Sequence, residues 1–231
     1  MKPEFACGHF VYRGVSDSIK HKLIPSIGRI SSSISKEADY EKETLSRFKL
    51  RSPSELKIQP TNDWDWLALA QHHGLPTRLL DWTSSPLIAL YFATKTPIRA
   101  NGTLFPCSSN GTSVYAWHTN NYINIEMHSD PFKYNCCGLF YPRHTTNRIT
   151  GQFGLFSIQP TPKMNFESLI KSNDFPNNLI TKFNFTKEVS EKIRRTLYLI
   201  GIRHESVFPD LDGFSHDLKI KFNHSTCHVK G

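Results

Sequence analysis

Guanidinium, hydroxyl and carboxylate groups are concentrated in three separated segments of the chain: around Arg13, around Asp81 to Ser85, and around Glu205 to Asp212. An arginine fork binds phosphate oxygens, and a carboxylate stabilises positive charge that develops beside it. Together with the hydroxyls, these groups suit an anion or a ribose with its phosphates. Each group also has a common structural use, in a turn, a helix cap or an ion pair.

The first segment is Tyr12-Arg13-Gly14, at the end of a strand predicted over 9–13. The guanidinium there could lie across a phosphate, and Gly14 would let a ligand approach the backbone. The alternative is an ordinary surface arginine before a turn. A tripeptide taken alone favours that alternative.

The second segment lies between two apolar helices. A helix beginning at Pro86 directs its free N–H groups back at this segment, which suits an anion or a ribose with its phosphates. Adjacent helical residues diverge, so we expect His73 inward and His72 toward the loop. Alternatively, Ser85 is only a helix cap and Arg78 pairs with Asp81; the clustering of polar groups favours a ligand site. These polar residues are Arg78, Asp81, Thr83, Ser84 and Ser85.

The third segment runs from 201 to 213. Glu205 is a candidate catalytic carboxylate at the end of a strand or helix. Asp210 and Asp212 could hold a hard cation, although the fragment lacks the ligand spacing of an EF-hand loop. Asp210 could instead cap a final helix.

Hydrophobic periodicity and turn residues predict the elements that position these groups. Strands are expected at 9–13, 113–118, 153–159, 179–185 and after Asp217, with an extended segment at 77–82. Helices are expected at 36–50, 62–74, 87–95 and 187–200. Residues 119–147 have weak periodicity and no assignment. No linker divides the chain, which predicts a single α+β domain of small mixed or antiparallel sheets with flanking helices.

The composition favours an anionic partner and an intracellular location. The formal net charge is +8 and the pI is about 9.3, which suits nucleic acid or a nucleotide but equally an ordinary basic protein. The five cysteines form no C-x-x-C pair, which indicates reduced thiols and no zinc site. No signal peptide or transmembrane segment is visible, so we expect a cytoplasmic protein with no membrane partner.

The segments together resemble the FRG domain family, named for its Phe-Arg-Gly motif, with Tyr12 in place of the Phe. The resemblance continues through LALAQHHGLPTRLLDWTSSPLIALYFA at 67–93, RITGQFGLFSI at 148–158 and ESVFPDLDG at 205–213. It implies one FRG domain over 1–231 with a core at about 9–222. The family is bacterial and phage-associated.

The chain also resembles, more weakly, ADP-ribosyltransferases of the Arg-Ser-Glu type. These carry an aromatic-Arg pair, a Ser-Thr-Ser-like triplet before a helix, and a final Glu, in the order found here. The chain departs from the pattern at 203–205, where Arg-His-Glu replaces Gln-x-Glu or Glu-x-Glu. The resemblance implies a split β-sandwich, NAD as substrate, and catalysis by Glu205, Arg13 and Ser84. The NAD-binding residues it implies are Tyr12, Arg13, Gly14, His72, Arg78, Asp81, Thr83, Ser84, Ser85, Tyr91 and Phe156.

The expected function is therefore NAD-dependent ADP-ribosyl transfer to nucleic acid or protein, in a toxin or phage-defence effector with an antitoxin or regulator as partner. One alternative is a metal-dependent nuclease in which Asp81, Asp210 and Asp212 hold Mg²⁺ and His72 is the base. The other is a non-enzymatic nucleic-acid-binding module. The transferase requires Arg13, Ser84 and Glu205 to line one cleft.

Overall fold

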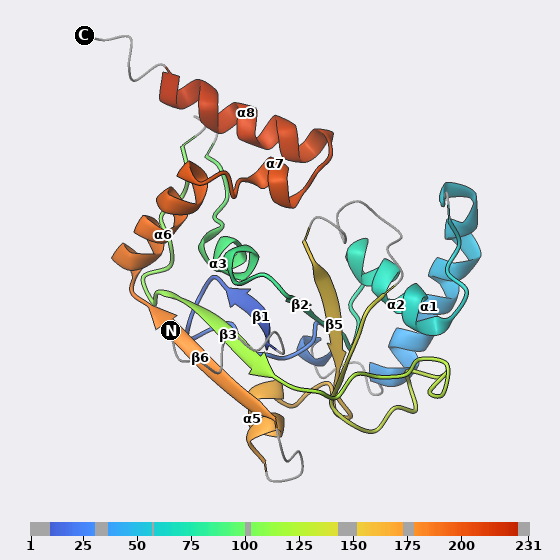
Figure 1. The fold of residues 1–231 in the computed structure, drawn as a ribbon. Coiled ribbons are helices and arrows are strands. Elements are labelled where there is room, and N and C mark those ends of the chain that lie inside the picture. The colour runs from blue at the N-terminus through green and yellow to red at the C-terminus, as the bar shows by residue number, and fades with distance from the viewer. Residues whose placement is uncertain are drawn as a thin grey trace.

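A computed structural model of the chain describes residues 10–30, 37–56, 58–99, 103–142, 152–172 and 178–225. Its centre is a six-stranded antiparallel sheet in the order β4-β5-β2-β1-β3-β6, with helices around it (Figure 1). The strands are β1 (Phe10–Val15), β2 (Leu80–Thr83), β3 (Thr112–His118), β4 (Gly138–Phe140), β5 (Gly154–Ile158) and β6 (Leu179–Phe185). The predicted α+β class with antiparallel strands is confirmed.

Of the neighbouring strands in the sheet, β1 and β2 share the fewest paired positions. One position is in register between them, Tyr12 opposite Thr83. By contrast, β1 pairs with β3 at every position from Phe10 to Val15. The described strands thus form one sheet with a narrow β1–β2 junction, and the split β-sandwich that the weaker resemblance implies is not found among them.

Alternation along β1 sends its side chains to two different cores. Val11 and Val15 pack in one cluster with Trp117 and with Phe166 of α5 (Phe166–Lys171). Tyr12 packs on the other face, against the cluster formed by α3 (Pro86–Thr94) and β3.

Gly14 allows α3 to approach β1 closely. A Cβ on Gly14 would lie 1.9 Å from the carbonyl oxygen of Ala89 and 2.6 Å from the amide nitrogen of Ala93. Both are backbone atoms of α3 and cannot move aside as a flexible side chain would. The glycine expected to serve a ligand is thus required by helix packing.

The second core lies between the sheet and the helices α1 (Glu37–Arg51) and α2 (Asp63–His72), which the 3-10 helix η3 (Ser52–Glu55) connects. The Asn62 side chain caps α2 by accepting from the Asp65 amide, and Gly74 follows the helix with φ +88°. Trp64 and Leu67 are fully buried, whereas His73 is exposed. The prediction that His73 points inward is wrong, because α2 ends at His72.

The C-terminal part is helical: α6 (Lys187–Leu199), α7 (His204–Val207) and α8 (Leu211–Ser225). The strand predicted after Asp217 is wrong. The buried positions Gly213, Asp217 and Ile220 are spaced by four and three residues, which is the period of a helix. In α6, Leu197 is buried, whereas Val189 is 41% exposed.

The unassigned segment 119–147 contributes β4, the edge strand beside β5. Cys107, Cys136 and Cys137 are free thiols, while Cys7 and Cys227 lie outside the described residues. Within the described ranges, no helix has both the length and the apolar character needed to cross a bilayer.

Candidate functional site

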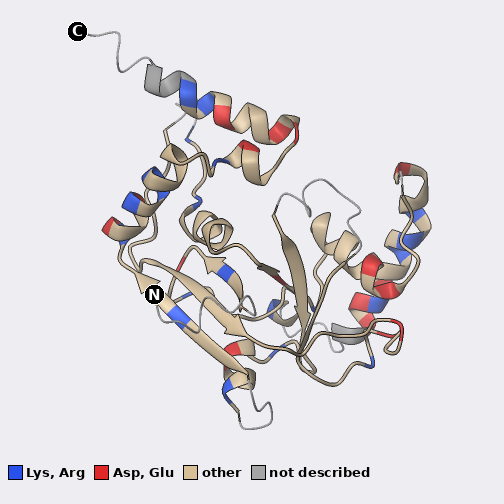
Figure 2. Cartoon of the chain, in the orientation of Figure 1, with Lys and Arg blue, Asp and Glu red and all other residues tan. Residues whose placement is uncertain are grey.

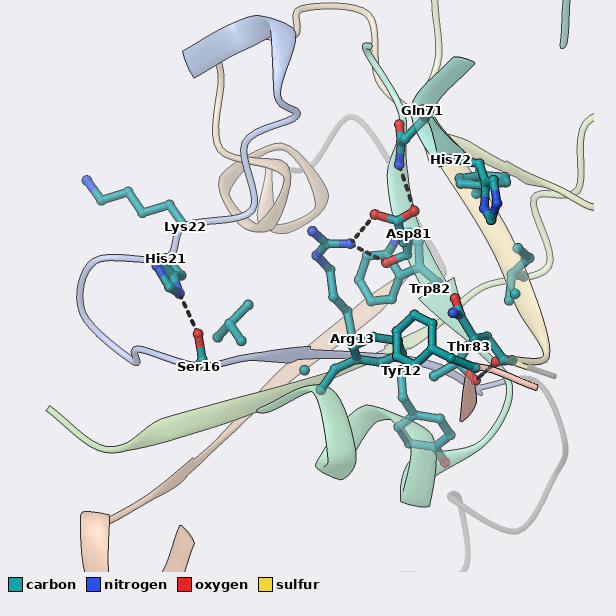
Figure 3. Close-up of a pocket in the computed structure, with 18 of the residues that line it drawn as sticks. Tyr12, Arg13, Ser16, His21, Lys22, Gln71, His72, Asp81, Trp82 and Thr83 are labelled. Carbon is teal, nitrogen blue, oxygen red and sulfur yellow. Dashed lines mark hydrogen bonds and ion pairs between the residues drawn. The ribbon is translucent and has the colours of Figure 1, made fainter. Parts of the chain in front are cut away.

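A pocket of about 450 Å³ lies where β1 and β2 diverge (Figure 3). Its volume is within the range of about 300 to 1,000 Å³ that small-molecule sites occupy. Both strands contribute to its wall, as do the residues after β1, the end of α2 and the start of β5. The lining residues are Tyr12, Arg13, Gly14, Val15, Ser16, His21, Lys22, Arg29, Gln71, His72, Asp81, Trp82, Thr83, Phe92, Gln152, Gly154, Leu155, Phe156 and Phe208.

Arg13 connects the two strands where their backbones separate. Its Nη1 donates to the Asp81 carbonyl oxygen at 2.5 Å and lies 3.2 Å from the Asp81 carboxylate Oδ2. The guanidinium thus occupies the acceptor that a continuing strand pair would use. Its Nε is buried and has no hydrogen-bond partner among the described residues. A ligand oxygen would satisfy that donor.

The Asp81 carboxylate is held from its other side by Gln71. The Gln71 Nε2 donates to Asp81 Oδ1 at 2.7 Å, and the Gln71 Oε1 accepts from the Thr77 hydroxyl. Because a carboxylate only accepts hydrogen bonds, it orients the amide with Nε2 toward Asp81 and Oε1 toward the Thr77 hydroxyl. Asp81 nevertheless keeps 62% of its side chain exposed, so it remains available to a ligand.

Thr83 ties β2 to the segment before β5. Its hydroxyl donates to the Gln152 carbonyl oxygen at 2.7 Å and accepts from the Ser85 amide at 3.1 Å. Phe153 follows with φ +48°, the one non-glycine residue with positive φ among the described residues, and its ring is 61% exposed. Such left-handed backbone is costly for a side chain and clusters at functional sites.

Cations line the pocket on the side of the segment after β1. Arg29 ends the 3-10 helix η2 (Ile27–Arg29), and Lys22 and His21 precede it. Burial lowers the pKa of Arg29, and the neighbouring Arg13 charge lowers it further while Asp81 opposes both. Both guanidinium groups line the same pocket, and their like charges repel.

The structure brings seven of the expected site residues to this pocket and places five elsewhere. Those in the pocket are Tyr12, Arg13, Gly14, His72, Asp81, Thr83 and Phe156. Those that do not line it are Arg78, Ser84, Ser85, Tyr91 and Glu205.

Arg78 and Ser85 have structural roles. Arg78 is 5% exposed, its Nε donates to the Glu41 carboxylate at 2.8 Å, and its guanidinium stacks on Phe132. The suggested pair of Arg78 with Asp81 is wrong, because each has another partner. Ser85 caps α3 by accepting from the Ile88 amide, as the capping alternative predicted.

Ser84 is exposed and its amide donates to the Phe153 carbonyl oxygen at 3.2 Å. The member of the triplet that lines the pocket is Thr83 instead. This one-residue difference follows from strand alternation, which sends neighbours to opposite sides.

Glu205 lies on α7 and belongs to a different cluster. Its carboxylate is 3.6 Å from the Lys221 ammonium, and its amide donates to the Asp217 carboxylate at 3.0 Å. Tyr91 is in the same region, where its hydroxyl contacts His204 Nδ1. The expectation that Glu205 shares one cleft with Arg13 is therefore wrong. Among the described residues that line the pocket, the C-terminal helical part contributes Phe208, which follows α7.

The carboxylates of the metal hypothesis are not brought together. Asp81 lines the pocket, whereas Asp210 caps α8 by accepting from the Gly213 amide at 2.9 Å. Among the described residues, no group of three or more His, Cys, Asp or Glu side chains is arranged to hold a metal ion.

Sequence reasoning missed the cations and amides of the pocket. Arg29 lies in a stretch, 26–35, whose serines and glycines predict a loop, and Lys22 lies in a stretch with no predicted element. Gln71 and Gln152 had a weak signal, since both fall in the stretches that carry the FRG resemblance. Positive charge is spread over several elements, and α6 carries more Lys and Arg than Asp and Glu (Figure 2). Net charge therefore did not point to this pocket.

Comparison with known proteins identifies the part of the chain that builds most of this site. Searches of curated proteins and of solved structures return no match. The family model of the FRG domain matches residues 8–102, which run from β1 through α3 and include Arg13, Gln71, Asp81 and Thr83. The resemblance to FRG domains that the sequence carries is thus confirmed for residues 8–102.

Proposed function

We propose that the pocket binds NAD and that the chain transfers its ADP-ribose to a nucleic acid or protein. The observation that carries this proposal is the meeting of Arg13 and Asp81 at the β1–β2 junction, with a guanidinium Nε that has no partner among the described residues. The unsatisfied donor suits an anionic group of a ligand, and the accessible carboxylate suits another part of the same ligand that becomes positively charged during the reaction. NAD combines a pyrophosphate with a ribose whose bond to nicotinamide breaks to leave a cation.

In the proposed reaction, the C1′–N bond of NAD breaks and nicotinamide leaves with the bonding electrons. The ribose becomes oxocarbenium-like, as in glycoside hydrolysis, and an acceptor nucleophile attacks C1′ and loses a proton. Asp81 stabilises the cation, since it is the one carboxylate among the described residues that line the pocket. Arg13 binds phosphate through its unpartnered Nε. Tyr12 and Phe156 offer aromatic surface for a base.

The proposal is tested by incubating the protein with NAD labelled in its adenylate part, together with RNA, DNA and a protein extract. Nicotinamide release and transfer of label are measured for the wild type and for Asp81→Asn. We expect both activities in the wild type and a loss of at least tenfold in the variant, because the amide carries no charge.

Glu205→Gln is the matched control, because it removes a carboxylate of the C-terminal helices that does not line the pocket. It should keep the wild-type rate. If the wild type neither releases nicotinamide nor transfers label, the proposal fails. Salt-sensitive RNA binding without turnover would instead identify a binding module.

A further inference from the structure

We infer that the pocket holds a second anion-binding position, formed by Arg29 and Lys22 beside Arg13, and that it selects ligands with two linked phosphate groups. This inference rests on the proposed function, because it concerns the same pocket. It specifies which part of a ligand the cationic side of the pocket recognises.

The charge balance of the pocket is the first argument. Its lining contains three permanent cations, Arg13, Lys22 and Arg29, but one carboxylate, Asp81. Asp81 already pairs with Arg13 at 3.2 Å. The remaining positive charge is not balanced by any other acidic residue of the lining within the described residues. A ligand with a charge of −2 or more would balance it.

The position of Arg29 is the second argument. Burial and the nearby Arg13 charge both lower its pKa, so the protein keeps two guanidinium groups close together at an energetic cost. An anion bound between them would convert this repulsion into two attractions. One phosphate on Arg13 Nε and a linked phosphate on Arg29 would use both groups.

The third argument is that this side of the pocket is already rigid. Leu23 and Ile27 are fully buried, and they lie between Lys22 and Arg29 in the sequence. The Ile27 amide donates to the Thr77 carbonyl oxygen at 3.1 Å, and the Ser26 hydroxyl donates to the same oxygen at 3.2 Å. The cations are therefore preorganised, and less conformational entropy is lost on binding.

The turn before Lys22 is fixed in the same way. Asp17 is 7% exposed and accepts from the amides of Ile19 and Lys20 and from the Ser108 hydroxyl. Burial alone would raise the pKa of Asp17, but the hydrogen bonds to its carboxylate outweigh burial and hold the pKa well below its usual range. The loop thus presents His21 and Lys22 at the rim without needing a ligand to order it.

The test uses inorganic pyrophosphate, orthophosphate and ADP-ribose as probes in calorimetric titrations at low ionic strength. We expect pyrophosphate and ADP-ribose to bind at least tenfold more tightly than orthophosphate. Arg29→Gln should weaken the two diphosphates at least tenfold and leave orthophosphate unchanged. Arg47→Gln is the control, since Arg47 lies on α1 and has 78% of its side chain exposed. It should leave all three affinities unchanged.

Equal binding of pyrophosphate and orthophosphate, or equal losses in the two arginine variants, would overturn the inference. Tight pyrophosphate with weak ADP-ribose would show a site for the free ion alone and would also overturn the inference. Thermal unfolding without ligand checks that Arg29→Gln is folded. If NAD is turned over and Arg29→Gln has no effect, only this inference fails; if pyrophosphate binds as expected without turnover, only the proposed function fails.

Discussion

The rings of His204 on α7 and His216 on α8 are stacked, with centroids 3.7 Å apart and planes inclined by 22°. Tyr91 of α3 contacts the first ring, and Asp217 lies 3.7 Å from the second. The stack thus joins the C-terminal helices to the helix that packs on β1. The rings are suited to this only while they are neutral.

The stack predicts a loss of stability in acid. Burial, then the charges of His216 and Lys95, lowers the pKa of His204 from 6.5 to about 4, against opposing effects of Asp217 and Asp210. Burial also lowers the pKa of His216, opposed mainly by Asp217. The unfolded chain takes up protons at a higher pH than the folded chain. The stabilisation of the fold by the neutral histidine rings is therefore complete above pH 6.5 and is lost as the pH falls toward 4.

Thermal unfolding from pH 7 to 4 measures this loss. His216→Phe keeps an aromatic ring but does not titrate, so its Tm should fall less than that of the wild type. His73→Gln, which changes an exposed ring, should follow the wild type. Parallel curves for all three proteins would contradict the assignment of the acid sensitivity to the stack.

Breaking the buried ion pair of Glu41 and Arg78 should be costly. Glu41 is 2% exposed and accepts from both the backbone amide and the Nε of Arg78. Glu41→Gln leaves the guanidinium buried without its counter-charge, which costs about 3 kcal/mol. Glu43→Gln on the same helix breaks only a surface pair and should cost less than about 0.5 kcal/mol. Urea unfolding measures the free energy of unfolding of both variants. Equal losses would show that the buried pair stabilises the protein no more than the surface pair.

Gly14→Ala should push α3 away from β1. The new methyl group would meet backbone atoms of Ala89 and Ala93, and overpacking of this kind costs about 1 to 3 kcal/mol or more. Gly74→Ala is the comparison, because no atom lies within 4 Å of its Cβ and only the positive φ is unfavourable. Its cost should be about 1 kcal/mol. A smaller loss for Gly14→Ala in thermal unfolding would show that α3 shifts freely.

Thr83→Val should loosen the connection between β2 and the start of β5. The substitution keeps the shape but removes the hydroxyl that bonds Gln152 and Ser85. Leaving these backbone groups unsatisfied costs about 1 to 3 kcal/mol. Thr83→Ser retains the hydroxyl and should recover most of the loss. Denaturant midpoints measure both variants, and a Ser variant as unstable as the Val variant would assign the effect to packing.

Local sequence patterns predicted most of the elements. β1, β3, β5 and β6 have runs of apolar or alternating residues, and α3 has both a Ser85 cap and Pro86 at its first position. β4 spans only Gly138–Phe140, too short for a periodicity of its own. The part of α8 after Asp217 is predicted as a strand because three apolar residues at alternate positions, Leu218, Ile220 and Phe222, imitate a strand over a few residues.

The site was predicted where its residues are also close in sequence or in strand register. Asp81 and Thr83 share β2, and register brings Tyr12 opposite Thr83. Motif order contains no information about distance, so it could not show that Glu205 joins Lys221 and Asp217 instead. Nor could it find Arg29, which becomes a neighbour of Arg13 only through the packing of the loop after β1.

The single registered position between β1 and β2 has a mechanical consequence. At the middle of the sheet, β1 and β2 are connected by one paired position and by the hydrogen bond from Arg13 to the Asp81 carbonyl oxygen. We therefore expect the sheet to bend most easily between these two strands. A ligand bound over the junction would contact both β1 and β2 and would restrict this bending. Slower deuterium uptake in β1 and β2 together would then report occupancy of the pocket, whatever chemistry follows.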